Sequence, residues 1–146
     1  MATSEAVVGT TNSAARISGI LAIIGGIVLI LSGVVTWIAV TNQLEAEKIT
    51  VSGDADCAAG EAVDGPISAY CQAEVINKHA LDTTGGKTYA ELERDDPARN
   101  TAMQASFLRA SLFTSVVSYG VAFMAVGLGI LFIIVGYALS SLSKRW

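Results

Sequence analysis

The chain has little charge, and two long stretches of it have none. Asp, Glu, Lys and Arg make up 15% of the 146 residues, whereas an average soluble chain carries about 25%. No Asp, Glu, Lys, Arg or His lies between Ile17 and Val40 or between Ala110 and Leu142. Uncharged apolar runs of roughly 18 or more residues are typical of transmembrane helices. The first run is also too long for the apolar core of a cleavable signal, so we expect a retained helix.

The absence of ionisable residues from both runs narrows the function. Ion pathways and proton relays usually leave such a residue inside the membrane, so a pump or transporter acting alone is disfavoured. Haem ligation within the bilayer is excluded too, because neither run has a histidine and Met124 is the only methionine there.

Histidine is equally scarce, since His79 is the only one. An ordinary zinc or non-haem iron site needs three or four ligands, and we expect a surface or packing role for His79. The stretch Gly85–Thr88 matches only the end of a phosphate-binding loop, because Leu81 stands where the first glycine is required. We therefore predict no catalytic residue, no metal site, no cofactor and no enzyme activity.

Cysteine is limited to Cys57 and Cys71, both between the two runs. An even number of cysteines in an oxidising compartment favours a disulfide. Closing a loop of about 15 residues would stabilise the fold by roughly 3 kcal/mol in the chain-entropy model. Free thiols and a reversible redox pair remain as alternatives.

The basic residues indicate the orientation. Arg16, Lys144 and Arg145 flank the runs at the two ends of the chain, whereas the connecting segment 41–110 holds twelve acids and six bases. Short basic flanks stay in the cytoplasm, and long loops cross largely regardless of charge. We predict a multi-pass plasma-membrane protein with both termini cytoplasmic and the loop extracytoplasmic.

The predicted fold class is an all-α membrane protein, a two-helix transmembrane hairpin with a partly helical, disulfide-stapled loop domain. The expected parts, in chain order, are a disordered cytoplasmic tail at 1–15, a first transmembrane helix with an outer extension at 16–48, the loop domain at 49–96, a second long helix at 97–142 with its membrane part at about 111–139, and a cytoplasmic tail at 143–146.

Local signals predict the elements of the loop domain. Pro66 in a first-turn position begins a helix that continues to about Asp82, and Gly85–Gly86 ends it. Thr88 and Glu91 fit a capping box, which predicts a short helix. Asp96 followed by proline predicts the start of the second long helix.

The outer part of that second helix should pack on the loop helix through large apolar side chains. The residues expected to meet are Met103, Phe107 and Leu108 on one side and Ile67, Tyr70 and Val75 on the other.

Glycine recurs at seven-residue spacing in both runs. The positions are Gly19, Gly26 and Gly33 in the first run and two pairs, Gly120 with Gly127 and Gly129 with Gly136, in the second. Seven residues return to nearly the same helix face, and small residues there let two helices approach closely in lipid. In an antiparallel hairpin, Gly33 would face Gly120 and Gly26 would face Gly127, with Gly19 near Gly136. The second pair, Gly129 and Gly136, begins two residues out of phase and could serve a separate partner helix. The alternative is that membrane helices simply use more glycine.

Four segments carry a resemblance to known proteins: Ile76–Leu81, Gly85–Leu92, Asp96–Arg99 and Ala105–Leu112. With these segments the chain resembles, from about Arg16 to the end of the second run, a family of small two-span actinobacterial membrane proteins. The resemblance implies the two-span architecture and an actinobacterial envelope.

Members of this family often carry the name aromatic ring-opening dioxygenase. Extradiol ring opening needs iron held by two histidines and a carboxylate, and His79 is the only histidine here, so we do not expect that activity. Small two-span proteins also occur as accessory subunits of actinobacterial respiratory assemblies, which is a similarity of shape only.

Three functions remain open on the sequence. The favoured one is an accessory or structural subunit of a larger membrane complex, with lipid and a protein partner. The alternatives are a self-associating homo-oligomeric envelope protein and an extracytoplasmic thiol-redox factor. A nucleic-acid partner is not expected, because segment 41–110 is acidic.

Overall fold

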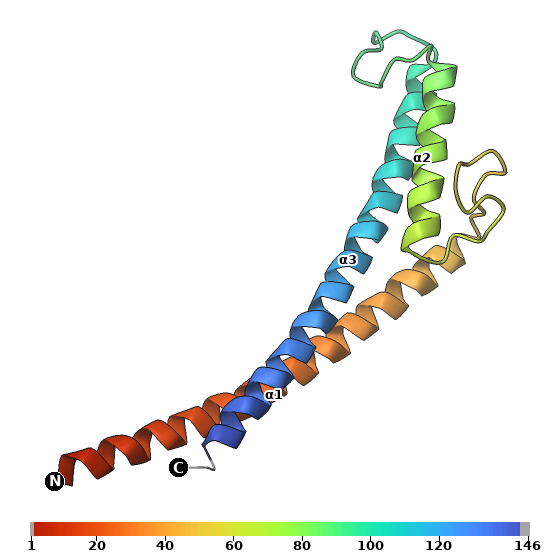
Figure 1. The fold of residues 1–146 in the computed structure, drawn as a ribbon. Helices are drawn as coiled ribbons and strands as arrows, with labels where there is room; N and C mark the ends of the chain where they lie inside the picture. The colour runs from red at the N-terminus through yellow and green to blue at the C-terminus, as the bar shows by residue number, and fades with distance from the viewer. Residues whose placement is uncertain (1, 144–146) are drawn as a thin grey trace. The chain divides into compact units, whose positions relative to one another are not determined.

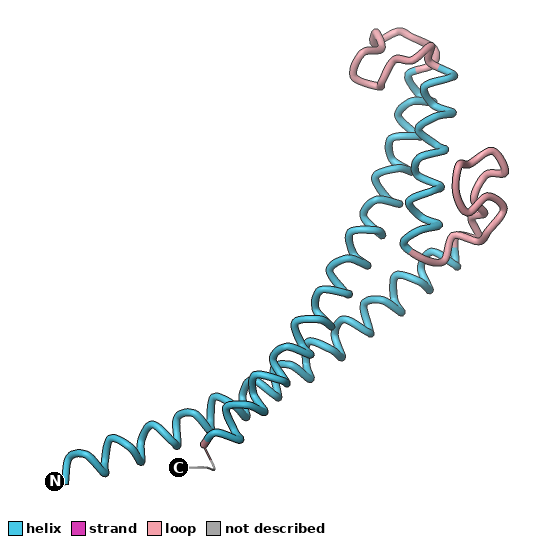
Figure 2. The backbone as a smooth tube through the Cα atoms, in the orientation of Figure 1, coloured by secondary structure: helices cyan, strands magenta, loops and turns pink. Residues whose placement is uncertain are grey.

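The computed structural model describes residues 2–143, with side chains from residue 13 on. Its three helices are α1 (Ala2–Ala46), α2 (Pro66–Thr83) and α3 (Arg99–Leu142) (Figure 1). No strand occurs among the described residues, and the connections 47–65 and 84–98 are loops (Figure 2). The all-helical prediction is therefore confirmed.

Two of the helices are long and apolar enough to cross a membrane, judged by length and composition. They are the stretch Ser13–Ala46 of α1 and the whole of α3. In the most apolar part of either helix only 17% of the residues are buried within the protein. Most of their large apolar side chains therefore face outward.

The start of α1 differs from the prediction. Residues from Ala2 on are helical, where a disordered tail was expected over residues 1–15. This tail is rich in alanine and has no proline, so helix can continue into it from the apolar run without a new nucleation step. Residues 144–146 of the predicted C-terminal tail lie outside the described residues.

The chain divides into two compact units. The hairpin unit comprises the residues up to Thr36 and those from Val121 on, and the loop unit comprises Trp37–Gly120. In the hairpin unit α1 and α3 run antiparallel, as the pairs of facing residues show. These pairs are Gly19 with Gly136, Gly26 with Gly129, and Gly33 with Ala122.

The observed register confirms the predicted pair Gly19 with Gly136 and corrects the partners of Gly26 and Gly33. A Cβ atom placed on Gly26 would lie 2.6 Å from the carbonyl oxygen of Gly129, so only glycine fits there. Gly120 and Gly127 have open space beside them, and they are outside the seam that was assigned to them. Both glycine pairs of α3 have the same spacing, so spacing alone could not choose between them. The observed register brings a third small residue, Ala122, against Gly33.

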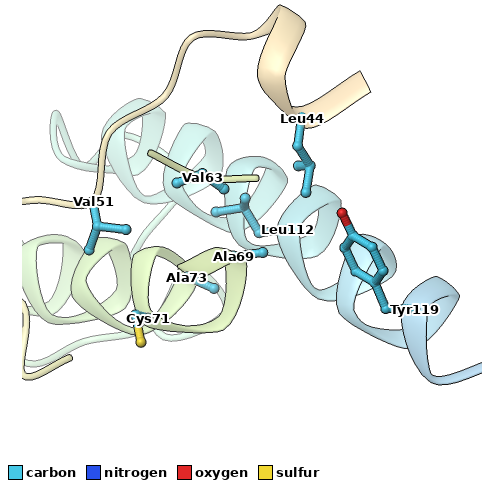
Figure 3. Close-up of a cluster of buried hydrophobic side chains, with 8 residues drawn as sticks. All are labelled: Leu44, Val51, Val63, Ala69, Cys71, Ala73, Leu112 and Tyr119. Atoms are coloured by element: carbon cyan, nitrogen blue, oxygen red, sulfur yellow. The ribbon is translucent and has the colours of Figure 1, made fainter. Parts of the chain in front are cut away.

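The core of the loop unit combines residues of all three helices with residues of the connection 47–65, hereafter the first loop. Figure 3 shows the cluster, in which the first loop contributes two valines, and its members are Leu44, Val51, Val63, Ala69, Cys71, Ala73, Leu112 and Tyr119. The loop is ordered by backbone bonds, since the N–H of Val51 donates to the carbonyl of Glu61 and the N–H of Val63 donates to that of Ile49. Segment 49–65 is therefore a tight folded loop.

Helix α2 begins at Pro66, as predicted, and its first turn is closed by a serine. The Ser68 hydroxyl oxygen accepts hydrogen bonds from the N–H groups of Asp64 and Gly65, both at 3.2 Å. At the other end Gly85 and Gly86 have positive φ angles of 65° and 85°, which glycine adopts readily, and the N–H of Gly86 caps the helix by donating to the carbonyl of Leu81.

Several residues buried along α2 and the outer part of α3 are smaller than those predicted to pack there. Ile67 is 73% exposed and Phe107 is 67% exposed, whereas Ala69, Ala73 and Ala102 are buried. Between α2 and α3, the ring of Tyr70 packs edge to face on Phe113, with centroids 6.0 Å apart. Of the predicted contact residues only Val75 is fully buried.

The short helix predicted at Thr88 is absent, because residues 89–91 form a turn. The Glu91 carboxylate does accept bonds from both the backbone N–H and the hydroxyl of Thr88, each at 2.8 Å. This local pair satisfies the turn without a following helix. Helix α3 begins at Arg99 rather than at Pro97, and the Asp96 carboxylate caps it by accepting a bond from the N–H of Ala98 at 2.8 Å.

Candidate functional site

The two cysteines form a disulfide, as the sequence predicted. Cys57 and Cys71 are joined with their Cα atoms 5.6 Å apart. Cys71 lies on α2 and is 2% exposed, whereas Cys57 lies in the exposed part of the first loop. Ala58 follows with a positive φ of 51°. The bond therefore attaches the first loop to the buried face of α2.

A cavity of about 300 Å³ lies beside this disulfide. Its lining includes both cysteines and one lysine, Lys78. Four carboxylates also line it: Asp54, Asp56, Glu74 and Asp82. Within residues 13–143, no group of three or more His, Cys, Asp or Glu side chains is placed to hold a metal ion. The cavity is thus acidic, and its carboxylates do not converge on one point.

One of these carboxylates pairs with the only histidine. The Nε2 atom of His79 lies 2.6 Å from Oδ2 of Asp54, and both side chains are about half exposed. The Ser52 hydroxyl also donates to Oδ1 of Asp54 at 2.7 Å. The hydrogen bond from His79, and then that from Ser52, lowers the pKa of Asp54 from 3.8 to about 2. His79 therefore lies at the surface, one of the two roles expected for it, and its pair with Asp54 joins the first loop to α2.

A second contact between loop and helices centres on Tyr119, the tyrosine in the outer part of the second uncharged run. Tyr119 is 1% exposed, and its hydroxyl lies 2.7 Å from Oγ1 of Thr41 and donates to the carbonyl of Asp64 at 3.1 Å. Its ring packs edge to face on Trp37, with centroids 4.6 Å apart. One tyrosine thus connects α1, α3 and the first loop.

These contacts give the loop unit several independent attachments. A further one is made by Gln72 of α2, whose side-chain carbonyl accepts a bond from the N–H of Ser52 at 3.0 Å. The only sequence signal for the Tyr119 contact was a tyrosine within an uncharged run. The signal for the buried face of α2 was the pair Ala69 and Ala73, four residues apart on one face.

These contacts anchor the first loop to the helices. The disulfide, the ion pair and the Tyr119 contacts all position backbone. Of the glycines predicted to pack helices, some lie in the seam between α1 and α3 and two have open space beside them. Gly19, Gly26, Gly33, Gly129 and Gly136 are in the seam, and Gly120 and Gly127 are not. Comparison of the chain with protein families, with curated proteins and with solved structures gives no match.

Proposed function

We propose that the chain is a two-span membrane protein that serves as a non-catalytic accessory subunit of a larger membrane complex. The membrane part rests on one observation, the outward exposure of large apolar side chains along both long helices. In water each such side chain would forgo roughly 1.5–3 kcal/mol of burial free energy. In a bilayer the same surface is favourable, and the helical backbone satisfies its own hydrogen bonds.

The accessory role is supported by the open glycines. With the seam formed, a Cβ atom added to Gly120 or to Gly127 would still meet no other atom within 4 Å. They lie seven residues apart on the continuous helix α3, so they share one face. A partner helix could approach the backbone closely there, which is the usual basis of helix association in lipid.

The proposed orientation has both termini in the cytoplasm and the loop unit outside. Arg16, Lys144 and Arg145 favour this orientation by the positive-inside rule. The disulfide supports it, because such bonds persist in oxidising compartments. A reporter fused after Trp146 should read as cytoplasmic, and a periplasmic signal would contradict the orientation.

The accessory role is tested by mild detergent extraction, capture through a C-terminal tag and mass spectrometry of the co-purified proteins. We expect one defined complex in a fixed ratio. Gly127→Leu should reduce the recovery of this complex. Gly25→Leu is the control and should not reduce it, because Gly25 on α1 has open space beside it but no second glycine seven residues away. A chain recovered alone, or cross-linked only to itself, would replace this proposal with a self-associating envelope protein.

A further inference from the structure

A second cavity of the loop unit has a mostly apolar and uncharged lining, unlike the acidic cavity beside the disulfide. It measures about 340 Å³ and lies between the end of α1, the middle of α2 and the outer part of α3. Its apolar lining consists of Leu44, Ile49, Ile76, Leu108 and Leu112. A cavity of about 220 Å³ adjoins it, and Ile76 and Leu108 line both. The combined space falls within the roughly 300–1,000 Å³ of typical small-molecule sites.

The polar lining consists mainly of uncharged hydrogen-bonding groups. Gln43, Gln72, Ser111 and Ser115 line the larger cavity, together with one carboxylate, Glu47. The carbonyl of Gln72 is engaged by the N–H of Ser52, which leaves its amide nitrogen as a donor. Among the described residues no lysine or arginine lines this cavity. An anionic group would therefore meet Glu47 without a compensating cation.

The cavity also lies where the charge-free runs end. Gln43 and Leu44 are the last uncharged residues of α1 before Glu45, and Ser111 follows soon after Arg109 on α3. If the two helices span a bilayer, as proposed above, these residues lie at the outer boundary of the hydrocarbon. An amphiphile dissolved in the outer leaflet could then reach the cavity without leaving the membrane interface.

We propose that this cavity binds the hydrocarbon chain of a membrane amphiphile whose head group is uncharged and forms hydrogen bonds. The chain lies against the leucine and isoleucine side chains, and the head group bonds to the glutamine amides and serine hydroxyls. This inference rests on the proposed membrane location and adds a ligand class to it. Burial of apolar surface supplies the affinity, and the unpaired carboxylate disfavours anionic lipids.

The test uses the full chain in phosphatidylcholine vesicles with a small amount of a photoreactive monoacylglycerol. We expect labelling within residues 43–49 and 108–115, identified by mass spectrometry. A fatty acid with the same photoreactive chain but a carboxylate head should label about tenfold less. Equal labelling by the two probes, or labelling spread evenly along both long helices, would overturn the proposal.

A matched pair of variants on α3 makes the test specific. Leu108→Trp places a bulky ring in both cavities and should reduce labelling about tenfold. Phe107→Trp is the control, because Phe107 is the exposed neighbour and lines neither cavity. Both positions are solvent-exposed to about half or more, so neither change should unfold the chain. Unchanged labelling in Leu108→Trp would refute the site.

The occupant is checked independently in native membranes. A benzoylphenylalanine residue in place of Leu108 should yield an adduct of lipid mass on irradiation. An adduct with another protein would instead identify the groove as a helix-docking surface, and a self-adduct would identify a dimer contact; either would overturn the lipid proposal. Alkaline extraction distinguishes failure of the proposed membrane location from failure of the proposed lipid site. A chain released from membranes contradicts the proposed membrane location itself, whereas a retained but unlabelled chain contradicts only the lipid site.

Discussion

The interactions inside the hairpin unit differ from those inside the loop unit. In the hairpin unit, α1 and α3 meet through glycine, with backbone atoms so close that no side chain fits between them. In the loop unit, a disulfide, an ion pair and side-chain hydrogen bonds join segments that share a small apolar core. Each unit uses the interaction that its proposed surroundings make effective.

The physical reason lies in the solvent. In lipid there is no hydrophobic driving force between two helices, so close packing of small residues drives their association. In water a small unit buries too little apolar surface to be stable by its core alone, and covalent or polar attachments supplement it. The comparison predicts that mutations of packing residues dominate in the hairpin unit and mutations of attachments dominate in the loop unit.

The largest effect should come from Gly26→Leu. Its side chain would collide with the backbone of Gly129, which cannot move without separating the helices. Overpacking costs about 1–3 kcal/mol and occasionally more, and a backbone obstacle puts this case at the upper end. The measurement is the detergent mole fraction that unfolds the reconstituted hairpin. Gly127→Leu is the control, since open space lies beside that residue. If Gly127→Leu destabilised the hairpin as strongly, the observed register would be wrong.

Next in size is removal of the disulfide by Cys57→Ala together with Cys71→Ala. The separation of 14 residues predicts a loss of about 3 kcal/mol, confined to the loop unit. Hydrogen exchange at the amides of Val51 and Val63 should accelerate, while exchange in the seam stays unchanged. Wild-type protein treated with strong reductant should behave the same way. Ready reduction by a mild physiological reductant would instead favour the thiol-redox alternative.

Tyr119→Phe should have an intermediate effect of about 1–2 kcal/mol. The change leaves the Asp64 carbonyl and the Thr41 hydroxyl without this partner in a part-buried setting, and a polar group that loses its bond away from water is costly. Thermal unfolding followed by Trp37 fluorescence in a Trp146→Phe background measures it. Tyr70→Phe should be nearly neutral, because the Tyr70 ring contact with Phe113 is retained. Equal losses would show that the Tyr119 hydrogen bonds contribute nothing specific.

The smallest effect concerns pH. The pKa of Asp54 is lowered from its ordinary value of 3.8 to about 2 in the folded protein. The ionised carboxylate therefore stabilises the folded loop fully at pH values above 3.8, and this contribution is lost as the pH falls through about 2. Because the pair with His79 is exposed, the change should be slight. Pepsin cleavage of the first loop should accelerate from pH 4 to pH 2 in wild type. Asp54→Asn should flatten this dependence, whereas Asp56→Asn, which keeps the pair with His79, should preserve it.

Several features could be predicted residue by residue, because they depend on local chemistry. Pro66 and Gly85 bound α2 through their own backbone preferences, and Asp96 caps α3 through its own carboxylate. The turn at Thr88 shows the limit of this approach. Its capping bonds to Glu91 are formed, yet no helix follows, because a capping pair satisfies a turn equally well.

The sequence by itself determined two long apolar helices and which two cysteines a disulfide could join. Long charge-free runs have few other stable conformations, and the chain has only two cysteines to join. Only the tertiary structure decided which glycines form the seam, since Gly120 with Gly127 and Gly129 with Gly136 repeat at the same interval. It also decided that Ala69 and Ala73 are buried while Ile67 is exposed. Periodicity identifies the faces of a helix, but the choice among similar faces depends on how closely two backbones can approach, and that is a property of the pair.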